Sequence, residues 1–133
     1  MSGLALYRGF TKLAMPMARL LLRRRLAKGK EDGTRIGERE GIASLARPDG
    51  PMAWLHAASV GEAQSALVLI ERLLSENADL KMLVTTGTVT SASHLKGRLP
   101  ERGFHQYLPL DCPQWVNRFL NHWQPDLAIW MAS

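Results

Sequence analysis

The chain has 133 residues, 46% of them hydrophobic, which is enough for one compact core and too few for two ordinary domains. Its formal charge is +5, but eight of its 17 basic residues precede the first acidic residue, Glu31. Residues 31–133 therefore carry nine basic and 12 acidic residues, a formal charge of −3, which argues against nucleic acid as a partner.

The first predicted element is an amphipathic helix over residues 4–25. At about 100° per residue its basic side chains fall within one wedge, and the opposite face is apolar. This pattern is typical of a helix lying in the plane of an anionic membrane surface, so we expect residues 1–25 to bind one. Basic residues interrupt the apolar run, so a full span is not expected, and Pro16 should bend or divide the helix. The wedge holds Arg8, Lys12, Arg19 and Arg23; the apolar face holds Leu6, Tyr7, Phe10, Leu13, Met17, Leu20 and Leu21.

Two other interpretations of this arm remain open. The helix could pack on the body through its apolar face, as amphipathic helices of globular domains do. An arginine-rich segment without acidic residues could also be a mitochondrial targeting peptide, whereas a cleavable secretory signal is disfavoured because no uninterrupted apolar region precedes a cleavage site. We expect a membrane-associating arm at 1–30, a glycine- and proline-rich linker or cap at 31–51, and a body at 52–133.

The body alternates between apolar runs of strand length and segments of helical periodicity. Such alternation predicts an α/β fold in which a Rossmann-like parallel sheet of about four strands carries helices on both faces. The predicted strands are 52–58, 81–85, 105–108 and 127–131, and the predicted helices are 62–76, 89–99 and 113–123.

The first strand-to-helix junction is the most informative segment of the chain. Ser59 and Glu62 match the S-x-x-E capping box, in which the serine caps the helix and the glutamate reaches back to an amide. A carboxylate at the positive end of a helix, beside the carboxyl end of a parallel strand, could instead act as a general base on a ligand hydroxyl. Both interpretations of Glu62 stay open at this point, and His56 nearby is expected to be a hydrogen-bonded core residue.

The second junction, residues 85–91, contains five hydroxyl side chains and one glycine. Its amides and hydroxyls could hold a phosphate or a sugar, while the simpler interpretation is that Thr88 or Thr90 caps the next helix. It is not a Walker loop, and no G-x-G-x-x-G follows any predicted strand, so nucleotide hydrolysis and dinucleotide binding lose support.

The remaining candidates are structural. Asp111 is expected to cap the helix that begins near Pro113. The only cysteine, Cys112, excludes an internal disulfide and a multi-cysteine metal site, and the four histidines lack ligand spacing, so we expect no metal.

Several motifs together resemble the amino-terminal domain of 3-deoxy-D-manno-octulosonic acid (Kdo) transferases. These are WLHAASVGE at 54–62, LVTTGTVTS at 83–91 and YLPLD at 107–111, supported by RIGER at 35–39 and WQPDL at 123–127. The likeness covers nearly the whole chain in the right order.

The resemblance implies a GT-B glycosyltransferase on the cytoplasmic face of the inner membrane, which transfers Kdo from CMP-Kdo to a lipid A precursor without a metal or other cofactor. The glutamate of the family's Ser-x-Gly-Glu motif is the catalytic base, and it corresponds to Glu62. We expect the acceptor cleft to be lined by Ser59, Gly61, Thr85, Thr86, Gly87 and Thr88.

This sequence also departs from the family. The family's chain continues from the last strand through Glu-x-Glu-Leu-Trp-Pro-Asn into a domain that binds CMP-Kdo, and Ala132 stands where the first of those glutamates is found. We therefore expect residues 52–133 to be a truncated acceptor-side domain, inactive alone. The alternative is a non-catalytic membrane-surface or partner-binding α/β module; a signalling receiver is disfavoured because the strand ends lack clustered aspartates.

Overall fold

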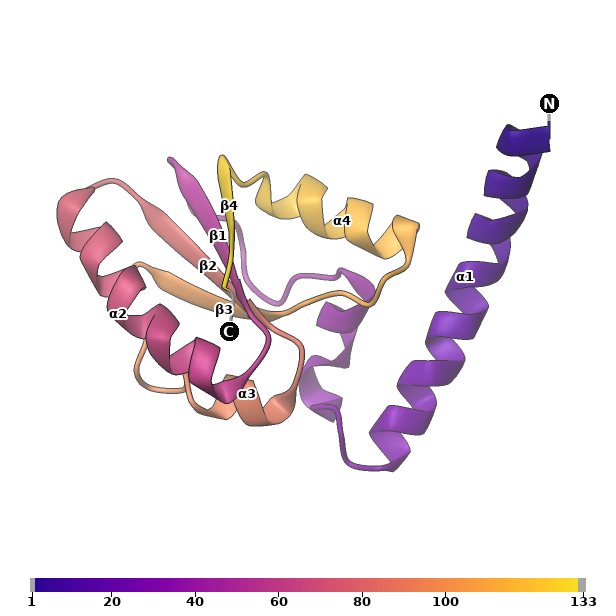
Figure 1. Cartoon of the computed structure of the whole chain (residues 1–133), viewed down its shortest axis with the longest axis horizontal. Helices are drawn as coiled ribbons and strands as arrows, with labels where there is room; N and C mark the ends of the chain where they lie inside the picture. The colour runs from indigo at the N-terminus through magenta and orange to yellow at the C-terminus, as the bar shows by residue number, and fades with distance from the viewer. Residues whose placement is uncertain (1, 132–133) are drawn as a thin grey trace.

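A computed structural model describes the backbone of residues 2–131 and the side chains of residues 13–131 (Figure 1). Its four strands are all parallel and lie in the order β3-β2-β1-β4, which confirms the predicted Rossmann-like α/β sheet. The elements are α1 (Ser2–Ala27), the 3-10 helix η1 (Gly33–Glu40), β1 (Met52–Ala57), α2 (Val60–Glu76), β2 (Lys81–Thr86), α3 (Val89–Ser93), β3 (Gly103–Tyr107), α4 (Pro113–Trp123) and β4 (Leu127–Trp130).

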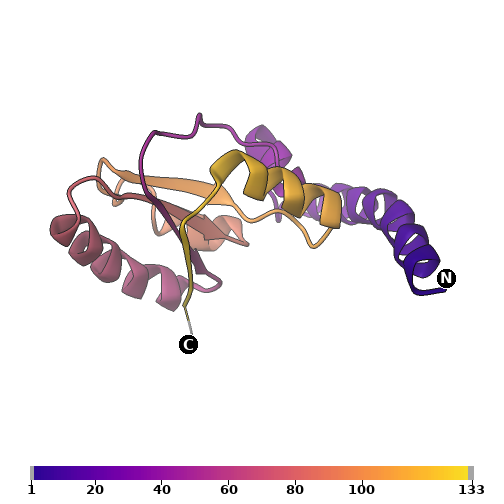
Figure 2. The ribbon, with the colours of Figure 1, turned by 90° about the horizontal axis from the view of Figure 1, so that it is seen from above.

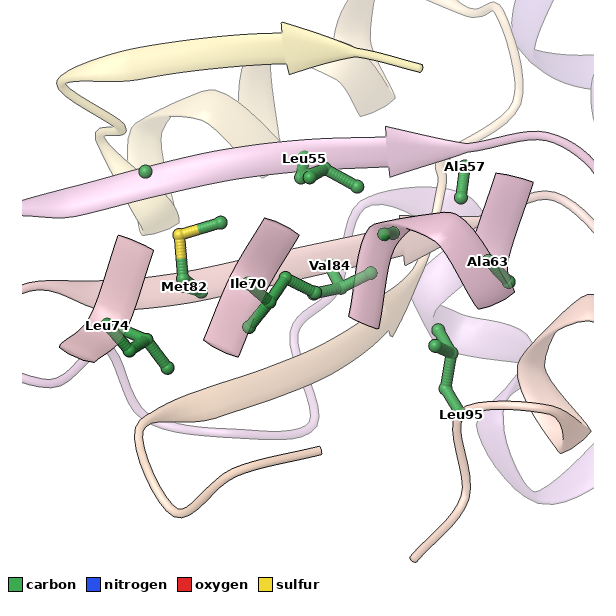
Figure 3. Packing of buried hydrophobic residues seen from close by; sticks show 10 residues of the cluster. Leu55, Ala57, Ala63, Ile70, Leu74, Met82, Val84 and Leu95 are labelled. Atoms are coloured by element: carbon green, nitrogen blue, oxygen red, sulfur yellow. The ribbon is translucent and has the colours of Figure 1, made fainter. Parts of the chain in front are cut away.

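Helices cover the two faces of the sheet, as Figure 2 shows for α2 and α4. Because successive side chains of a strand point to opposite faces, each strand contributes to two cores. On one face Leu55 and Val84 pack against Ile70 of α2 (Figure 3). On the other face, Met52 and Leu83 pack with side chains of α4, namely Phe119 and Trp123.

The order of the strands creates a switch point between β1 and β4. The chain leaves β1 into α2, moves along the sheet to β2 and β3, and then returns through α4 on the opposite face to pair β4 with β1. In open parallel sheets, ligands bind outside the carboxyl ends of the strands where the winding reverses. The junction that follows β1 therefore occupies the place in the fold where a ligand crevice is expected.

The predicted end of one helix and the predicted cap of another are wrong. The helix predicted over 89–99 ends at Ser93, and single turns continue to Arg98. Among these turn residues Gly97 has a φ of +74°, which favours glycine and stops a helix. Asp111 does not cap α4: the capping position belongs to Cys112, whose side chain makes no capping bond. Pro113 follows at the start of the helix, where a missing N–H costs nothing.

The amino-terminal helix α1 runs unbroken through Pro16, so the predicted division is wrong. One of its faces packs on the body, where Leu22 is buried with Trp115 and Cys112, which confirms that the helix docks. The docked face is not the expected apolar face, because Leu13 and Met17 remain 64% and 69% exposed. The side chains of residues 6–12 in the predicted pattern, and Ala132, lie outside the described residues.

Within the segment expected to be a linker or cap, residues 31–51, the 3-10 helix η1 is folded onto the body. In η1 the side chains of Glu38 and Arg39 are buried, and the following Gly41 has a φ of +80°. A Cβ at Gly41 would lie 2.1 Å from the carbonyl oxygen of Trp115. Only glycine fits there, so the sequence lets η1 approach the backbone of α4 closely.

Candidate functional site

Glu62 lies in the first turn of α2, directly beyond the carboxyl end of β1. Ser59 caps the helix, with its Oγ accepting from the Glu62 amide at 3.2 Å. The Glu62 carboxylate turns back, and its Oε1 accepts from the Ala58 amide at 3.0 Å. The capping box is therefore formed, with the glutamate reaching one residue before the cap.

Only one oxygen of the Glu62 carboxylate is used in this arrangement. Among the described residues no donor lies on Oε2, and the side chain is half-buried rather than enclosed. A hydrogen bond from a main-chain amide fixes the orientation of the carboxylate, so the second oxygen is held in place while remaining free to accept a proton.

The first two strand-to-helix junctions each contain a glycine that the fold does not require. A Cβ at Gly61 or at Gly87 would meet no atom within 4 Å, and neither residue has a positive φ. Glycine at both positions leaves open space where the first two strand-to-helix junctions end. A ligand could approach the backbone there more closely than side chains would allow.

The hydroxyls of the second junction divide into exposed and buried groups. Thr88 caps α3, with its Oγ1 accepting from the Ser91 amide at 3.1 Å, which confirms the capping interpretation. Thr85 and Thr86 are fully buried, and their hydroxyls bind other protein side chains. Ligand contact from this junction stays a prediction for all four residues, Thr85, Thr86, Gly87 and Thr88, and in the structure the hydroxyls of Thr85 and Thr86 are turned to protein side chains.

The Thr85 hydroxyl joins two aromatic side chains of β1. It accepts from Trp54 Nε1 at 2.8 Å and lies 2.8 Å from His56 Nδ1. His56 is 6% exposed, and burial lowers its pKa below the ordinary value, in part opposed by the charge of Glu62. The expected hydrogen-bonded core histidine is confirmed at Nδ1.

A partly buried ionic cluster, not predicted from the sequence, lies behind the second junction. Arg35 forms a two-pronged ion pair with Glu38 at 2.8 and 2.9 Å, and it also donates to the His105 carbonyl oxygen at 3.1 Å. Glu38 Oε1 in turn accepts from the Tyr107 amide at 2.8 Å. The pair thereby satisfies backbone and side-chain groups at the carboxyl end of β3.

His105 connects this cluster to the threonine junction. The Nδ1 of His105 lies 3.0 Å from Arg35 Nη2, and the Nε2 of His105 lies 2.9 Å from Thr86 Oγ1. Because a guanidinium can only donate, Nδ1 accepts and Nε2 carries the proton donated to Thr86. Burial and the adjacent Arg35 lower the pKa of His105 from 6.5 to about 4, so the ring is neutral.

A second arginine of η1, the buried Arg39, ties the arm to the body. Arg39 pairs with Glu31 at 3.1 Å and donates to the Leu108 carbonyl oxygen, while Arg25 of α1 pairs with the same Glu31 at 2.6 Å. Two sequence signals point to this segment: the RIGER motif at 35–39, and charge at residues 31–40 without helical periodicity. The second is equally typical of a solvated loop.

The described residues include no group of three or more histidine, cysteine, aspartate or glutamate side chains placed to hold a metal ion. Within residues 2–131, none of the helices is long and apolar enough to cross a membrane.

With this geometry established, comparisons with known proteins identify the family. The family model described as 3-deoxy-D-manno-octulosonic-acid transferase (kdotransferase) matches residues 34–133. The chain belongs to the Kdo transferase family. The match includes residues 34–40 of η1, so the ionic cluster of Arg35, Glu38 and His105 lies within the part that the family model covers.

Curated relatives agree with this assignment. The chain is 40% identical over 128 residues to the probable 3-deoxy-D-manno-octulosonic acid transferase, mitochondrial, of Arabidopsis thaliana, covering 96% of this chain and 29% of the relative. It is 38% identical over 128 residues to the transferase of Rickettsia bellii, covering 96% and 31%. A Haemophilus influenzae relative is 39% identical over 102 residues, covering 74% and 23%.

The chain therefore spans about 30% of the length of the first two relatives. No solved structure matches it significantly.

The neutral His105 should make stability depend on pH. Its folded pKa of about 4 lies below the ordinary 6.5, so the unfolded chain binds the extra proton and stability falls as the pH falls between these values. Between about pH 7.5 and pH 5 we expect His105 to account for a loss of roughly 2 kcal/mol in the free energy of unfolding.

The measurement is urea unfolding of the chain and of His105→Gln at both pH values. The variant removes the titrating ring, so its free energy of unfolding should change less between the two conditions. Equal pH dependence in the two proteins would show that the ring titrates normally.

Proposed function

We propose that this chain forms the acceptor-side part of an enzyme that transfers Kdo from CMP-Kdo to a lipid A precursor, with Glu62 as the general base. The observation that carries the proposal is the fixed Glu62 carboxylate at the switch point, with one oxygen unoccupied by any described residue. Family membership and the open space at Gly61 and Gly87 support it.

The chemistry of such a transfer needs one base. The acceptor hydroxyl oxygen attacks the anomeric carbon of Kdo, the bond from that carbon to the phosphate oxygen breaks, and CMP leaves with the electron pair. The hydroxyl proton passes to Glu62 Oε2. Because the phosphate is already a good leaving group, no second carboxylate is needed, unlike in glycoside hydrolysis.

The reaction is proposed for a complete protein of the relatives' length. Transfer requires donor and acceptor to be held in a near-attack arrangement, and a GT-B enzyme achieves this between two domains. Ser59, Gly61, Gly87 and Thr88 would then face the acceptor, while Thr85 and Thr86 support them from within.

Glu62→Gln tests the base. In a transferase whose amino-terminal part is this chain, we expect Kdo transfer, measured as CMP release, to fall about 100-fold or more because the amide cannot take the proton. Folding should persist, since glutamine can also accept from the Ala58 amide.

The matched control is Glu71→Gln, which changes an exposed carboxylate on the same helix and should leave transfer unchanged. Full transfer by Glu62→Gln would favour a non-catalytic α/β module.

Gly61→Ala should affect ligand binding without affecting the stability of the fold. Its Cβ meets nothing in the structure, and alanine favours a helix, so the free energy of unfolding should stay the same or rise by up to about 1 kcal/mol. The KM for the acceptor should increase because the methyl group enters the open space. An unchanged KM would mean that no ligand approaches Gly61.

We also propose that α1 binds the cytoplasmic face of an inner membrane. Its docked face is separate from a second, exposed apolar face, which includes Leu13, Met17, Leu20 and Leu21. The exposed Arg19, Arg23 and Arg24 could contact anionic headgroups. A groove of about 580 Å³ between this face and Leu110 adds apolar surface.

Vesicle co-sedimentation of the chain tests this second proposal. Binding to anionic phosphatidylglycerol vesicles should exceed binding to phosphatidylcholine vesicles and weaken with salt. Joint Met17→Ser and Leu21→Ser substitution should weaken it at least about tenfold, because each side chain loses its burial in the lipid.

Val68→Ser is the control, since Val68 is 72% exposed on α2, away from α1. Equal loss in the control, or no binding by the original chain, would contradict a role for this face.

A further inference from the structure

His56 is the side chain at the switch point that the proposed mechanism leaves unused. It is the penultimate residue of β1 and lies two residues before Ala58, whose amide fixes Glu62. Its neighbour across the strand pair is Trp130 of β4, and the two rings lie 4.8 Å apart. Trp130 is 58% exposed, so the histidine ring is covered on one side by an aromatic group that itself reaches the surface.

The hydrogen bonds of the Thr85 hydroxyl determine which ring nitrogen of His56 carries the proton. The Thr85 hydroxyl is fully buried, accepts from Trp54 Nε1, and has His56 Nδ1 as its only acceptor among the described residues. A buried hydroxyl that donated to nothing would be costly, so Thr85 donates to Nδ1. His56 Nε2 then carries the ring proton.

None of the hydrogen bonds among the described residues involves Nε2, and Thr85 contacts the ring through its hydroxyl at Nδ1 and through its backbone. The nearby charges that affect the ring are Glu62, which raises its pKa, and Arg39, which lowers it, while burial lowers it most. Glu62 is therefore close enough for its charge to affect the pKa of His56. Because the pKa remains below the ordinary value, the ring is a neutral donor at physiological pH.

We propose that His56 is a ligand-binding residue of this site, whose Nε2–H donates a hydrogen bond to a hydroxyl or phosphate oxygen of the acceptor glycolipid. The inference rests on the proposed function and deepens it. A rigid neutral donor suits an acceptor that must bind close to Glu62, because it orients an oxygen without an ion pair that would neutralise the base. Trp54 and Thr85 are positioning residues that set the tautomer through Nδ1.

The tautomer can be measured on the chain itself. Long-range ¹H–¹⁵N NMR of histidine-labelled protein should report a neutral ring protonated on Nε2, titrating below the ordinary pKa of 6.5. Thr85→Val removes the hydroxyl and should abolish the preference for this tautomer. A ring protonated on Nδ1 in the original chain would overturn the inference.

Binding tests the contact directly. The probe is a water-soluble, de-acylated lipid A precursor, titrated into the chain while the His56 resonances are followed. We expect the Nε2 signal to shift, and His56→Asn, which keeps a group near Thr85 but cannot reach as far, to bind about three- to tenfold more weakly, the range of one neutral hydrogen bond. His56→Gln places an amide near the Nε2 position and should recover part of the affinity.

His122→Gln is the matched control, because His122 lies near the end of α4 and contacts the Leu45 carbonyl oxygen. It should bind the probe as the original chain does.

The outcomes separate the two proposals. If the original chain and His56→Asn bind the probe equally, the His56 inference fails while the acceptor site stands. If the original chain shows no binding, the proposed acceptor function fails as well. Binding that Glu62→Gln preserves, together with loss in His56→Asn, is the pattern expected of a base and a separate binding residue.

Discussion

Parallel pairing of β1 on both of its edges is the constraint on which the rest of this structure depends. β2 and β4 occupy the two edges, so β1 is the central pivot from which the chain winds in two directions. The helices that follow β1 and precede β4 must then lie on opposite faces, and the carboxyl end between them is left without a covering helix. The position of Glu62 follows from this topology together with the two-residue turn at Ala58 and Ser59.

Charged side chains of η1 support the carboxyl end of β3, and of these Glu38 and Arg39 are buried while Arg35 is partly buried. Arg35, Glu38 and Arg39 donate to or accept from backbone groups of residues 105–108, in addition to pairing with acidic or basic partners. Ion pairs of this kind are costly to desolvate and contribute to stability only when such additional hydrogen bonds are made. Their effect here is geometric: they hold the end of β3 and, through His105, the Thr86 hydroxyl in one arrangement.

The sequence allowed the parallel α/β sheet and the location of Glu62 at the end of a strand to be predicted, because strand and helix periodicities in residues 52–131 are strong. It did not indicate the order of the strands. It misplaced the end of α3, where Gly97 breaks a pattern that apolar spacing alone continues to Leu99. The cluster around Arg35 and His105 could not be predicted, since it joins residues 70 positions apart and leaves no local period. Likewise, the burial of Thr85 and Thr86 depends on partners supplied by two other strands.

The helix α1 has one face committed to the body and another facing outward. Leu22 is enclosed between α4 and η1, and Arg25 is tied through Glu31 to Arg39, so α1 cannot roll about its own axis without breaking these contacts. When the outward face of α1 binds a surface, the sheet must therefore lie at a fixed angle to that surface. The helix would therefore set the orientation of the sheet relative to that surface, in addition to attaching the protein to it.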